Sequence, residues 1–311
     1  MPTRRTAGAW CAVAVSLAGC GSASSTPPST TLASTTLASV TASALGAASP
    51  VSSPVTIIVS SKNVAQSTSL AERTTGPQPA SDCQQIAFDV ALHHPGTSQV
   101  VVVATPNATA TGATLQVAER TALGWACTTP VAARVGRAGT RPLLQRRSGD
   151  GTTPAGVFPL GVMTAWDGQV FSFFGNSADP GVAAGGFRRV KVGDCFGATP
   201  NNTTYGHLVF RARASCPGPD DEYLPAFGSV YERAALIGAN MEPNVSGDAP
   251  GEVPYAAAIF LHRNSYDATG NSKATSGCVS LSHADLIAVL TRLRAGALFA
   301  IGDTAWLLAN S

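Results

Sequence analysis

Residues 81–311 are predicted to form a single, mainly β domain, a sandwich or barrel, with one helix close to its C-terminal end. Short runs of β-branched and aromatic residues recur along this part of the chain, which is typical of strands. Glycine and proline separate these runs, as expected of turns. Only one stretch has the periodicity of an amphipathic helix. The length would suit one large β domain or two small ones, and we expect one.

The strands expected from these runs differ in how apolar they are. Most are short and bounded by polar turns. Residues 256–261 form a continuous apolar run, which favours a strand buried on both faces. In chain order, the expected strands are 100–104, 114–117, 125–127, 170–174, 256–261 and 297–301.

The helix is predicted to begin after Ser282. Ser282 and Asp285 have the spacing of a capping box, and Gly296 can end the helix. His283 then falls in the exposed first turn, so we discount it as a catalytic residue. The apolar face of the helix consists of Leu286, Val289, Leu290 and Leu293.

Residues 1–20 have the features of a secretory signal peptide. Arg4 and Arg5 precede an apolar run at 9–17, which is too short to span a bilayer. The run leads into a Leu-Ala-Gly-Cys sequence that resembles a bacterial lipobox and ends at Cys20. We therefore expect a lipoprotein in which Cys20 carries a lipid anchor on the outer face of the cytoplasmic membrane. Ordinary cleavage with release of the protein is the alternative.

Residues 21–80 are rich in serine, threonine, alanine and proline and carry almost no charge. Such a composition buries too little apolar surface to offset the entropy lost on folding. A flexible chain of this length has a root-mean-square span of about 40 to 50 Å. We expect a disordered tether that holds an extracytoplasmic domain away from the membrane.

The overall charge and composition exclude several classes of function. A net charge of +2, with no stripe of basic residues, argues against a nucleic-acid partner. The His93-His94 pair has no cysteine or carboxylate cluster near it, so no metal site is expected. No phosphate-binding loop is present, and we expect no cofactor.

The chain has seven cysteines, and this number limits how many of them can form disulfides. Cys11 would leave with the signal peptide and Cys20 would carry lipid, so an odd number remains in an extracytoplasmic domain. Pairing neighbours in the sequence leaves Cys278 free, although other connectivities are open. The pairs closest in sequence are Cys83 with Cys127 and Cys195 with Cys216.

Cys278 is the candidate nucleophile, and His262 is the candidate base. Small residues surround Cys278, and Gly277 allows another chain to approach the backbone closely. A free thiol with a pKa near 8.5 is only about 3% ionised at neutral pH, so a nucleophilic cysteine needs a base or a positive charge nearby. The polar segment 264–273 can bring His262 back to it. The alternative is a hydrogen-bonded structural histidine and a small buried cysteine.

Two segments resemble the YkuD-type L,D-transpeptidases. The family signature is a histidine followed, after a spacer, by Ser/Thr-His-Gly-Cys. It is resembled here by His262 and the Thr-Ser-Gly-Cys sequence at 275–278. Residues 146–158 resemble its Gly-Asp-x-x-Thr-Pro-x-Gly-x-Phe segment, and the resemblance covers roughly residues 134–302. Ser276 departs from the second histidine of most members. Ser280 stands where arginine or asparagine is common.

The resemblance implies an L,D-transpeptidase-like domain that forms 3→3 cross-links between peptidoglycan stem peptides. Cys278 would form a thioester on a tetrapeptide stem, and His262 would accept the thiol proton and later serve the acceptor amine. The carbonyl of Arg263 would orient His262, and the N–H groups of Gly277 and Cys278 would stabilise the oxyanion. Carbapenem-type inhibitors would acylate the same cysteine. The expected substrate contacts are Thr275, Ser276 and Asn264.

Other functions remain open at this point. Water as the acceptor would make the same site an L,D-carboxypeptidase. A wall-associated lipoprotein that uses the fold only as a scaffold is the non-enzymatic alternative. A papain-like or NlpC-like peptidase is disfavoured, because those enzymes place the cysteine before the histidine in the chain.

Overall fold

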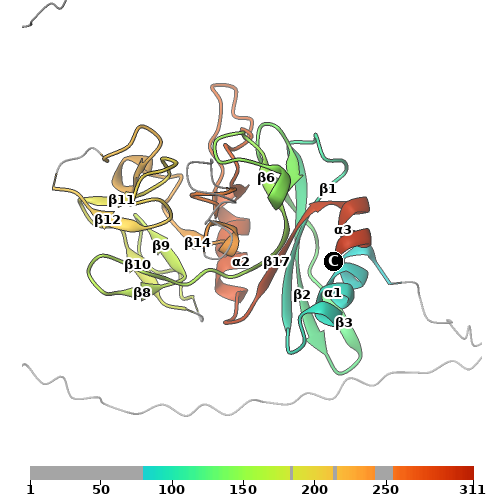
Figure 1. Cartoon of the computed structure of the whole chain (residues 1–311). Coiled ribbons are helices and arrows are strands. Elements are labelled where there is room, and N and C mark those ends of the chain that lie inside the picture. The colour runs from blue at the N-terminus through green and yellow to red at the C-terminus, as the bar shows by residue number, and fades with distance from the viewer. Residues whose placement is uncertain (1–79, 183–184, 213–215, 242–254) are drawn as a thin grey trace, which may run out of the picture. The chain divides into compact units, whose positions relative to one another are not determined.

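The computed structural model describes residues 80–182, 185–212, 216–241 and 255–311. The structure is mainly β, as the sequence predicts (Figure 1). Its largest element is one long sheet with the strand order β10-β9-β14-β15-β16-β4-β2-β1-β17-β6-β5, to which β3 is added beside β2. The proposed signal peptide, Cys20 and most of the proposed tether lie outside the described residues.

The strands of this sheet are short toward one edge and longer around β1, β2 and β17. Their bounds are β1 (Gln99–Thr105), β2 (Gly112–Thr121), β3 (Gly124–Cys127), β4 (Val131–Arg134), β5 (Thr140–Pro142), β6 (Thr153–Pro159), β9 (Phe173–Gly175), β10 (Phe187–Arg189), β14 (Ala234–Leu236), β15 (Phe260–Arg263), β16 (Val279–Leu281) and β17 (Leu298–Asp303).

Two smaller sheets and several helices complete the described structure. One small sheet has the order β12-β11-β13 and the other pairs β7 with β8. The small-sheet strands are β7 (Met163–Thr164), β8 (Val170–Phe171), β11 (Asp194–Phe196), β12 (Leu208–Phe210) and β13 (Glu222–Tyr223). The α-helices are α1 (Asp82–His93), α2 (His283–Arg292) and α3 (Thr304–Asn310), and 3-10 turns occupy Leu143–Gln145, Leu224–Phe227 and Gly238–Asn240.

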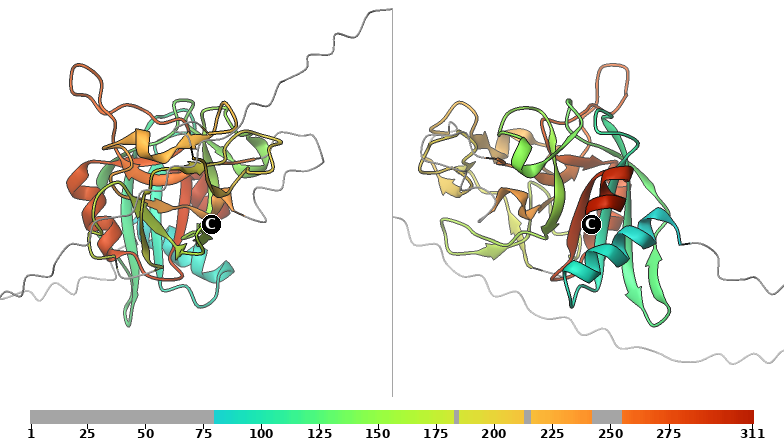
Figure 2. Two further views of the ribbon diagram at one scale, coloured as in Figure 1. Left: turned by 90° about the vertical axis from the view of Figure 1, so that its left-hand side faces the viewer. Right: turned by 45° about the vertical axis from the view of Figure 1, so that its right-hand side comes forward.

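Side chains alternate between the two faces of the central strands, and the helices cover both faces. Val101 and Val103 on β1 pack in the same core as α2, whereas Val100 and Val102 pack against α1 and α3. Figures 1 and 2 show α1 and α3 together on one side of β17. The inner core also contains side chains from β6 and β9, near opposite ends of the strand order, so the sheet curls around it.

A further core lies between the β12-β11-β13 sheet and the strands β9, β14 and β15. It is rich in aromatic rings and includes the sulfur of Cys278. Phe174 and Phe196 both make edge-on contacts with Phe260, at centroid distances of 5.1 Å. The small sheet is thereby packed directly against the strand that leads to His262.

The prediction of one helix is wrong, because the described residues contain three α-helices. α1 has a full capping box formed by Ser81 and Gln84, and its buried residues follow the helical spacing i, i+3, i+4, i+7. In the sequence, the serine-rich segment that ends at the same place obscures this signal. α3 has seven residues, too few for a periodic pattern. The buried residues of α1 are Cys83, Ile86, Ala87 and Val90.

The expected C-terminal helix forms, with small differences. The Ser282 side chain accepts a hydrogen bond from the Asp285 N–H, and α2 ends at Arg292. Gly296 lies in the turn that follows, with φ +79°, rather than at the helix end. No helix among the described residues is long and apolar enough to cross a membrane.

Two expected strands differ from the prediction. The run 170–174 divides at Ser172 into β8 and β9, because the Ser172 N–H bonds to the carbonyl of Gly185 instead of continuing one ladder. The apolar run 256–261 becomes a strand only at Phe260. Ala258 has φ +50°, a left-handed conformation that no strand can contain.

Among the described residues, two disulfides join the pairs closest in sequence. Cys83 on α1 is bonded to Cys127 on β3, and Cys195 on β11 to Cys216. Cys278 is the free cysteine of the described residues. The thiol is therefore available for chemistry in a domain that is otherwise cross-linked.

Candidate active site

The parallel pair β15 and β16 brings the predicted nucleophile and base onto one face of the sheet. Leu261 pairs with Val279 and His262 with Ser280, so Cys278 lies beside Phe260 at the entrance to β16. Side chains two residues apart on a strand share a face, so Phe260 and His262 point to the same side of β15. Cys278 is beside Phe260 and therefore lies on the same side as His262. Both are buried, with 6% of His262 and 7% of Cys278 exposed.

The Cys278 thiol is enclosed by backbone groups and one phenol. Its sulfur donates to the Ala258 carbonyl over 3.0 Å and accepts from the Phe260 N–H over 3.4 Å. The Tyr231 side chain packs in the same core as the sulfur, and its hydroxyl is placed to favour the thiolate. Burial, with the nearby Glu222 carboxylate, raises the pKa of the Cys278 thiol well above its usual value. The cysteine is thus a neutral thiol until a base removes its proton.

His262 is held as a neutral imidazole. Its Nδ1 lies 2.7 Å from the carbonyl oxygen of Arg263, and since a carbonyl only accepts, Nδ1 carries the proton. Burial lowers the pKa of His262 to about 4, against the opposite effect of that hydrogen bond. Nε2 is therefore free to accept a proton. Within the described part of the chain, no hydrogen bond joins His262 to Cys278.

The loop before Cys278 is braced by its own hydroxyl. Thr275 Oγ1 accepts from the Gly277 N–H over 3.1 Å and donates to the Cys278 carbonyl over 2.6 Å. Gly277 has φ +150°, and a Cβ there would lie 3.0 Å from the Thr152 carbonyl. Glycine is therefore required at 277, and its N–H, expected to bind an oxyanion, is already engaged by Thr275.

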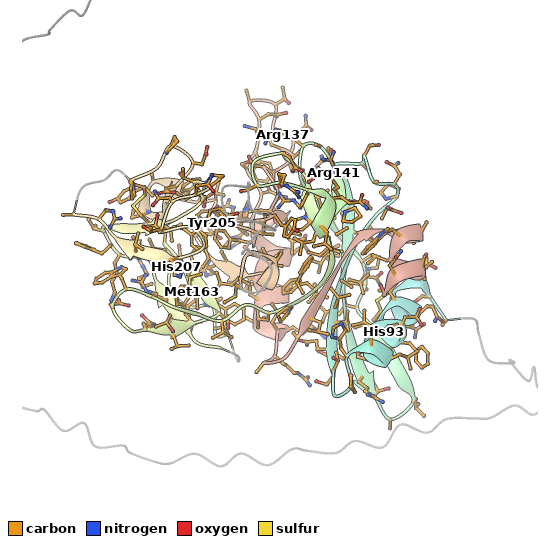
Figure 3. The ribbon with its side chains drawn as sticks, in the orientation of Figure 1. His93, Arg137, Arg141, Met163, Tyr205 and His207 are labelled. Atoms are coloured by element: carbon orange, nitrogen blue, oxygen red, sulfur yellow. A yellow bond between two sulfur atoms is a disulfide. The ribbon has the colours of Figure 1, made fainter. Side chains whose placement is uncertain are left out.

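A cavity of about 310 Å³ opens onto Cys278 and carries charges of both signs. Arg137 and Arg146 line it on one side, and Asp220 and Glu222 come from the segment around β13. Figure 3 shows Arg137 near the loops above β6 and Tyr205 toward the β11–β12 sheet. The volume is at the lower end of the range for ligand sites. Small lining residues around the thiol are Ala257, Ala258, Ser276 and Gly277.

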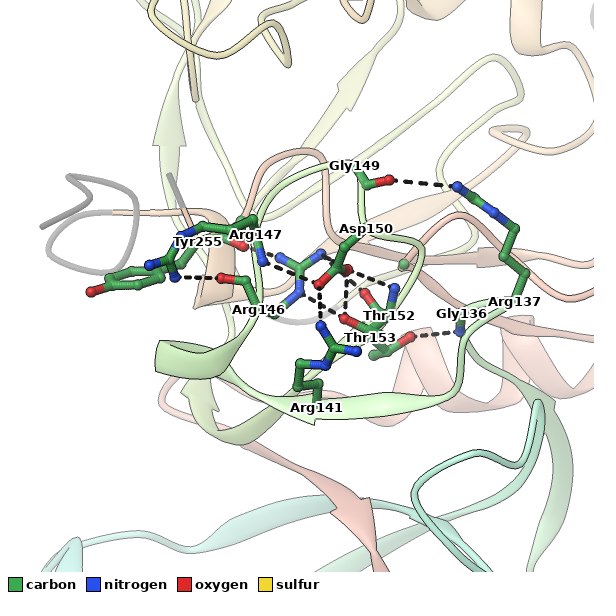
Figure 4. A network of polar contacts seen from close by, with 12 residues as sticks. Gly136, Arg137, Arg141, Arg146, Arg147, Gly149, Asp150, Thr152, Thr153 and Tyr255 are labelled. Atoms are coloured by element: carbon green, nitrogen blue, oxygen red, sulfur yellow. Dashed lines mark hydrogen bonds and ion pairs between the residues drawn. The ribbon is translucent and has the colours of Figure 1, made fainter. Parts of the chain in front are cut away.

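Arg146 is a buried cation in the wall of this cavity (Figure 4). Its guanidinium donates to the Thr152 carbonyl over 3.0 Å and to the Tyr255 carbonyl, and it forms an ion pair with Asp150 at 3.5 Å. Burial opposes ionisation of Asp150, but bonds from Thr152 and Arg147 and the Arg146 charge keep its pKa below the usual value. The segment 146–158 thus builds a charged wall beside the thiol.

The sequence-predicted substrate residues do not all reach this cavity. Ser276 lines it, whereas the Thr275 hydroxyl is used to brace the loop. Asn264 lies in the wall of a different cavity, of about 610 Å³, and accepts a hydrogen bond from Ser280 over 2.7 Å. His283, as expected, is not at the cavity, and its half-exposed ring contacts Glu232.

Two residues at the thiol were not found from the sequence. Tyr231 precedes β14 and Glu222 lies in β13, and neither segment contains a recognisable motif. Only the tertiary packing of the small sheet brings them to Cys278. Among the described residues, no three His, Cys, Asp or Glu side chains are grouped so as to hold a metal ion.

Comparison with known families adds one finding. A family model for the L,D-transpeptidase catalytic domain, YkuD, matches residues 99–301. The matched segment runs from the start of β1 into β17 and contains both Cys278 and His262. No curated protein matches the chain.

Proposed function

We propose that this chain, which belongs to the YkuD family of L,D-transpeptidase catalytic domains, forms 3→3 cross-links in peptidoglycan through Cys278. The family is cysteine-dependent and acts on peptidoglycan stem peptides. The observation that carries the proposal is the free thiol of Cys278 at the end of a cavity lined by both cations and carboxylates. A stem peptide with ammonium and carboxylate groups has matching charges.

In the first half-reaction, the Cys278 sulfur attacks the carbonyl of the third residue of a tetrapeptide stem. A carbon–sulfur bond forms and the bond to the terminal D-alanine breaks, while a base takes the thiol proton and a proton is delivered to the departing D-alanine nitrogen. His262, neutral and oriented by the Arg263 carbonyl, is suited to proton transfer at this site. The product is a thioester that retains the energy of the broken peptide bond, so no nucleotide is needed.

In the second half-reaction, a side-chain amine of another stem attacks the thioester. The carbon–sulfur bond breaks, the amine loses a proton and the sulfur regains one. The Cys278 N–H, beside the reacting carbon, is a donor for the oxyanion formed in each half. The Gly277 N–H can share this role only by leaving Thr275.

The test is incubation of the full chain with purified tetrapeptide stems, followed by mass spectrometry. A transpeptidase gives cross-linked dimers and free D-alanine, and Cys278→Ala gives neither. D-alanine without dimers would assign the L,D-carboxypeptidase reaction instead. Neither product from the wild-type chain would favour the scaffold alternative, which the burial of the thiol also suits.

We also propose that the domain works outside the cytoplasm, tethered to the outer face of the cytoplasmic membrane. The support comes from the lipobox-like sequence ending at Cys20 and from the two disulfides, which form in oxidising compartments. A tethered enzyme could reach stems of the surrounding polymer while remaining anchored.

A further inference from the structure

A second polar path leads away from the Cys278 sulfur, and it does not pass through His262. The Tyr231 side chain packs in the same core as Cys278, and a hydrogen bond from its hydroxyl would favour the thiolate. The same hydroxyl donates to Glu222 Oε2 over 2.7 Å. Because Glu222 also lines the Cys278 cavity, the thiol, the phenol and the carboxylate form one connected group.

The Tyr231 ring is held so that its hydroxyl has little freedom. Only 2% of the residue is exposed. The ring stacks on Phe227 at 4.7 Å between centroids and makes edge-on contacts with Phe260 at 5.6 Å and with His262 at 5.3 Å. A phenol fixed in this way is positioned for proton transfer without reorganisation.

Glu222 is fixed in turn by the small sheet. It pairs with Phe196 across β13 and β11, and β11 is anchored by the disulfide at Cys195. Burial raises the pKa of Glu222 to about 7, although the bond from Tyr231 acts in the opposite direction. A carboxyl group with such a pKa can exchange protons near neutral pH, as a general base must.

Other ionisable groups around the thiol are less suited to this exchange. Arg137 and Arg146 carry guanidinium groups, which only donate, and Asp220 lines the cavity, whereas the Tyr231 hydroxyl bonds to Glu222. His262 has a pKa of about 4, and Tyr205 one of about 12, both because of burial. Glu222 is the group here whose charge changes near pH 7.

We propose that Tyr231 and Glu222 form a proton relay for the Cys278 thiol, with Tyr231 as a further catalytic residue. The S–H group turns from the Ala258 carbonyl to the Tyr231 oxygen, which takes the thiol proton while its own proton passes to Glu222. The result is a thiolate, an intact phenol and a neutral carboxylic acid, so protons and charge balance. The relay supplies the thiolate for the proposed transpeptidase and leaves His262 for the acceptor amine.

The relay can be tested on the thiol alone. The rate of Cys278 alkylation by iodoacetamide is measured against pH in the full chain. With the relay, the wild-type rate rises through about pH 7 and then levels off, because the thiolate paired with protonated Glu222 no longer depends on pH. Control by His262 would place the rise near pH 4 instead.

Variants separate the relay from a structural role. Glu222→Gln and Tyr231→Phe should lose the rise near pH 7 and react at pH 8 about 100-fold more slowly. Glu222→Asp should restore part of the rise, and His262→Gln should retain it. Tyr223→Phe, on the neighbouring residue, and Glu119→Gln, on β2, are the matched controls and should follow the wild type.

The outcomes decide the relay independently of the proposed function. A plateau above pH 7 that persists in both Glu222→Gln and Tyr231→Phe would overturn the relay. If either variant fails to fold, the wild-type chain still decides, because an alkylation rate that rises near pH 4 would overturn the relay. Wild-type chain that shows the relay but releases no D-alanine from stems would leave the relay standing and refute the transpeptidase.

Discussion

Glu232 and Arg263 form an ion pair of 2.7 Å, and the carbonyl of the same arginine accepts the hydrogen bond from His262. The carboxylate is only slightly exposed, so the contact links the segment before β14 to the end of β15. Glu232 therefore supports the backbone group that sets the tautomer of the imidazole, although it does not touch the reacting atoms.

We expect Glu232→Gln to lower the rate of transfer from the thioester to the acceptor amine by about tenfold, since misplacing the proton-transfer group of that step costs at least that much. Stability should change by less than about 1 kcal/mol, because the arginine is partly exposed. His283→Gln, which removes a different contact of the same carboxylate, is the control and should transfer to the acceptor amine at the normal rate. Equal losses in both variants would show that Arg263 has no special role.

Carbapenems should add their mass to the chain at Cys278. The electrophilic carbonyl of a carbapenem would form the same thioester as an acyl donor. Intact mass followed by peptide mapping measures the addition, and Cys278→Ala should show none. Because the four other domain cysteines are in disulfides, a label found elsewhere would contradict a functional thiol at 278.

Gly277→Ala should destabilise the domain by about 3 kcal/mol, since the new Cβ meets the Thr152 carbonyl in a left-handed conformation. Gly270→Ala is a matched control: φ is +85° there and no atom lies within 4 Å of the added Cβ. It should cost about 1 kcal/mol from the backbone alone. Urea unfolding of both variants measures the difference, and equal costs would mean that the loop relaxes freely.

The dependence of stability on pH should reveal two opposing groups. Burial raises the pKa of Glu222 from 4.5 to about 7, so the folded state binds its proton more tightly and stability falls as pH rises between these values. Burial lowers the pKa of His262 from 6.5 to about 4, so its contribution rises with pH over that window. The two slopes should nearly cancel between about pH 4.5 and 6.5.

Single substitutions should uncover each slope in urea unfolding at several pH values. Glu222→Gln should make stability rise with pH in that window, and His262→Gln should make it fall. An unchanged, flat profile in both variants would indicate that neither group is perturbed in the folded state.

Cys20→Ala should release the protein from the membrane fraction and abolish labelling by radioactive palmitate. The reason is that a lipidated first residue is the proposed anchor, and no other anchor is proposed for residues 21–80. Fractionation of cells that express the two forms measures this. A variant that remains with the membrane would instead point to binding through the domain.

The sequence predicted the parts of the site that depend on local signals. Cys278 and His262 share one face of the parallel pair β15 and β16. The apolar run 256–261 predicted the first of these strands in part, whereas β16 was not predicted. Glu222 and Tyr231 could not be predicted in this way. Their segments join the site only through the pairing of β13 with β11 and through aromatic packing, and neither leaves a periodic signal.

The shape of the apolar run before His262 was also beyond local reasoning. Six apolar residues are ordinarily a strand, and the sequence gives no sign that Ala258 adopts a positive φ. The conformation is maintained by tertiary contacts, including the bond from the Cys278 thiol to the Ala258 carbonyl. Strain of this kind occurs where the surroundings impose it and is not encoded by residue type.

The burial of Cys278 has a consequence for how the protein survives where it is made. Disulfide exchange requires the attacking sulfur to line up with both sulfurs of the disulfide, and an enclosed sulfur does so slowly. While Cys83, Cys127, Cys195 and Cys216 are being oxidised in pairs, the fifth cysteine of the domain is the one least able to take part in exchange. An oxidising environment can thus complete the cross-linking of this chain without consuming its nucleophile.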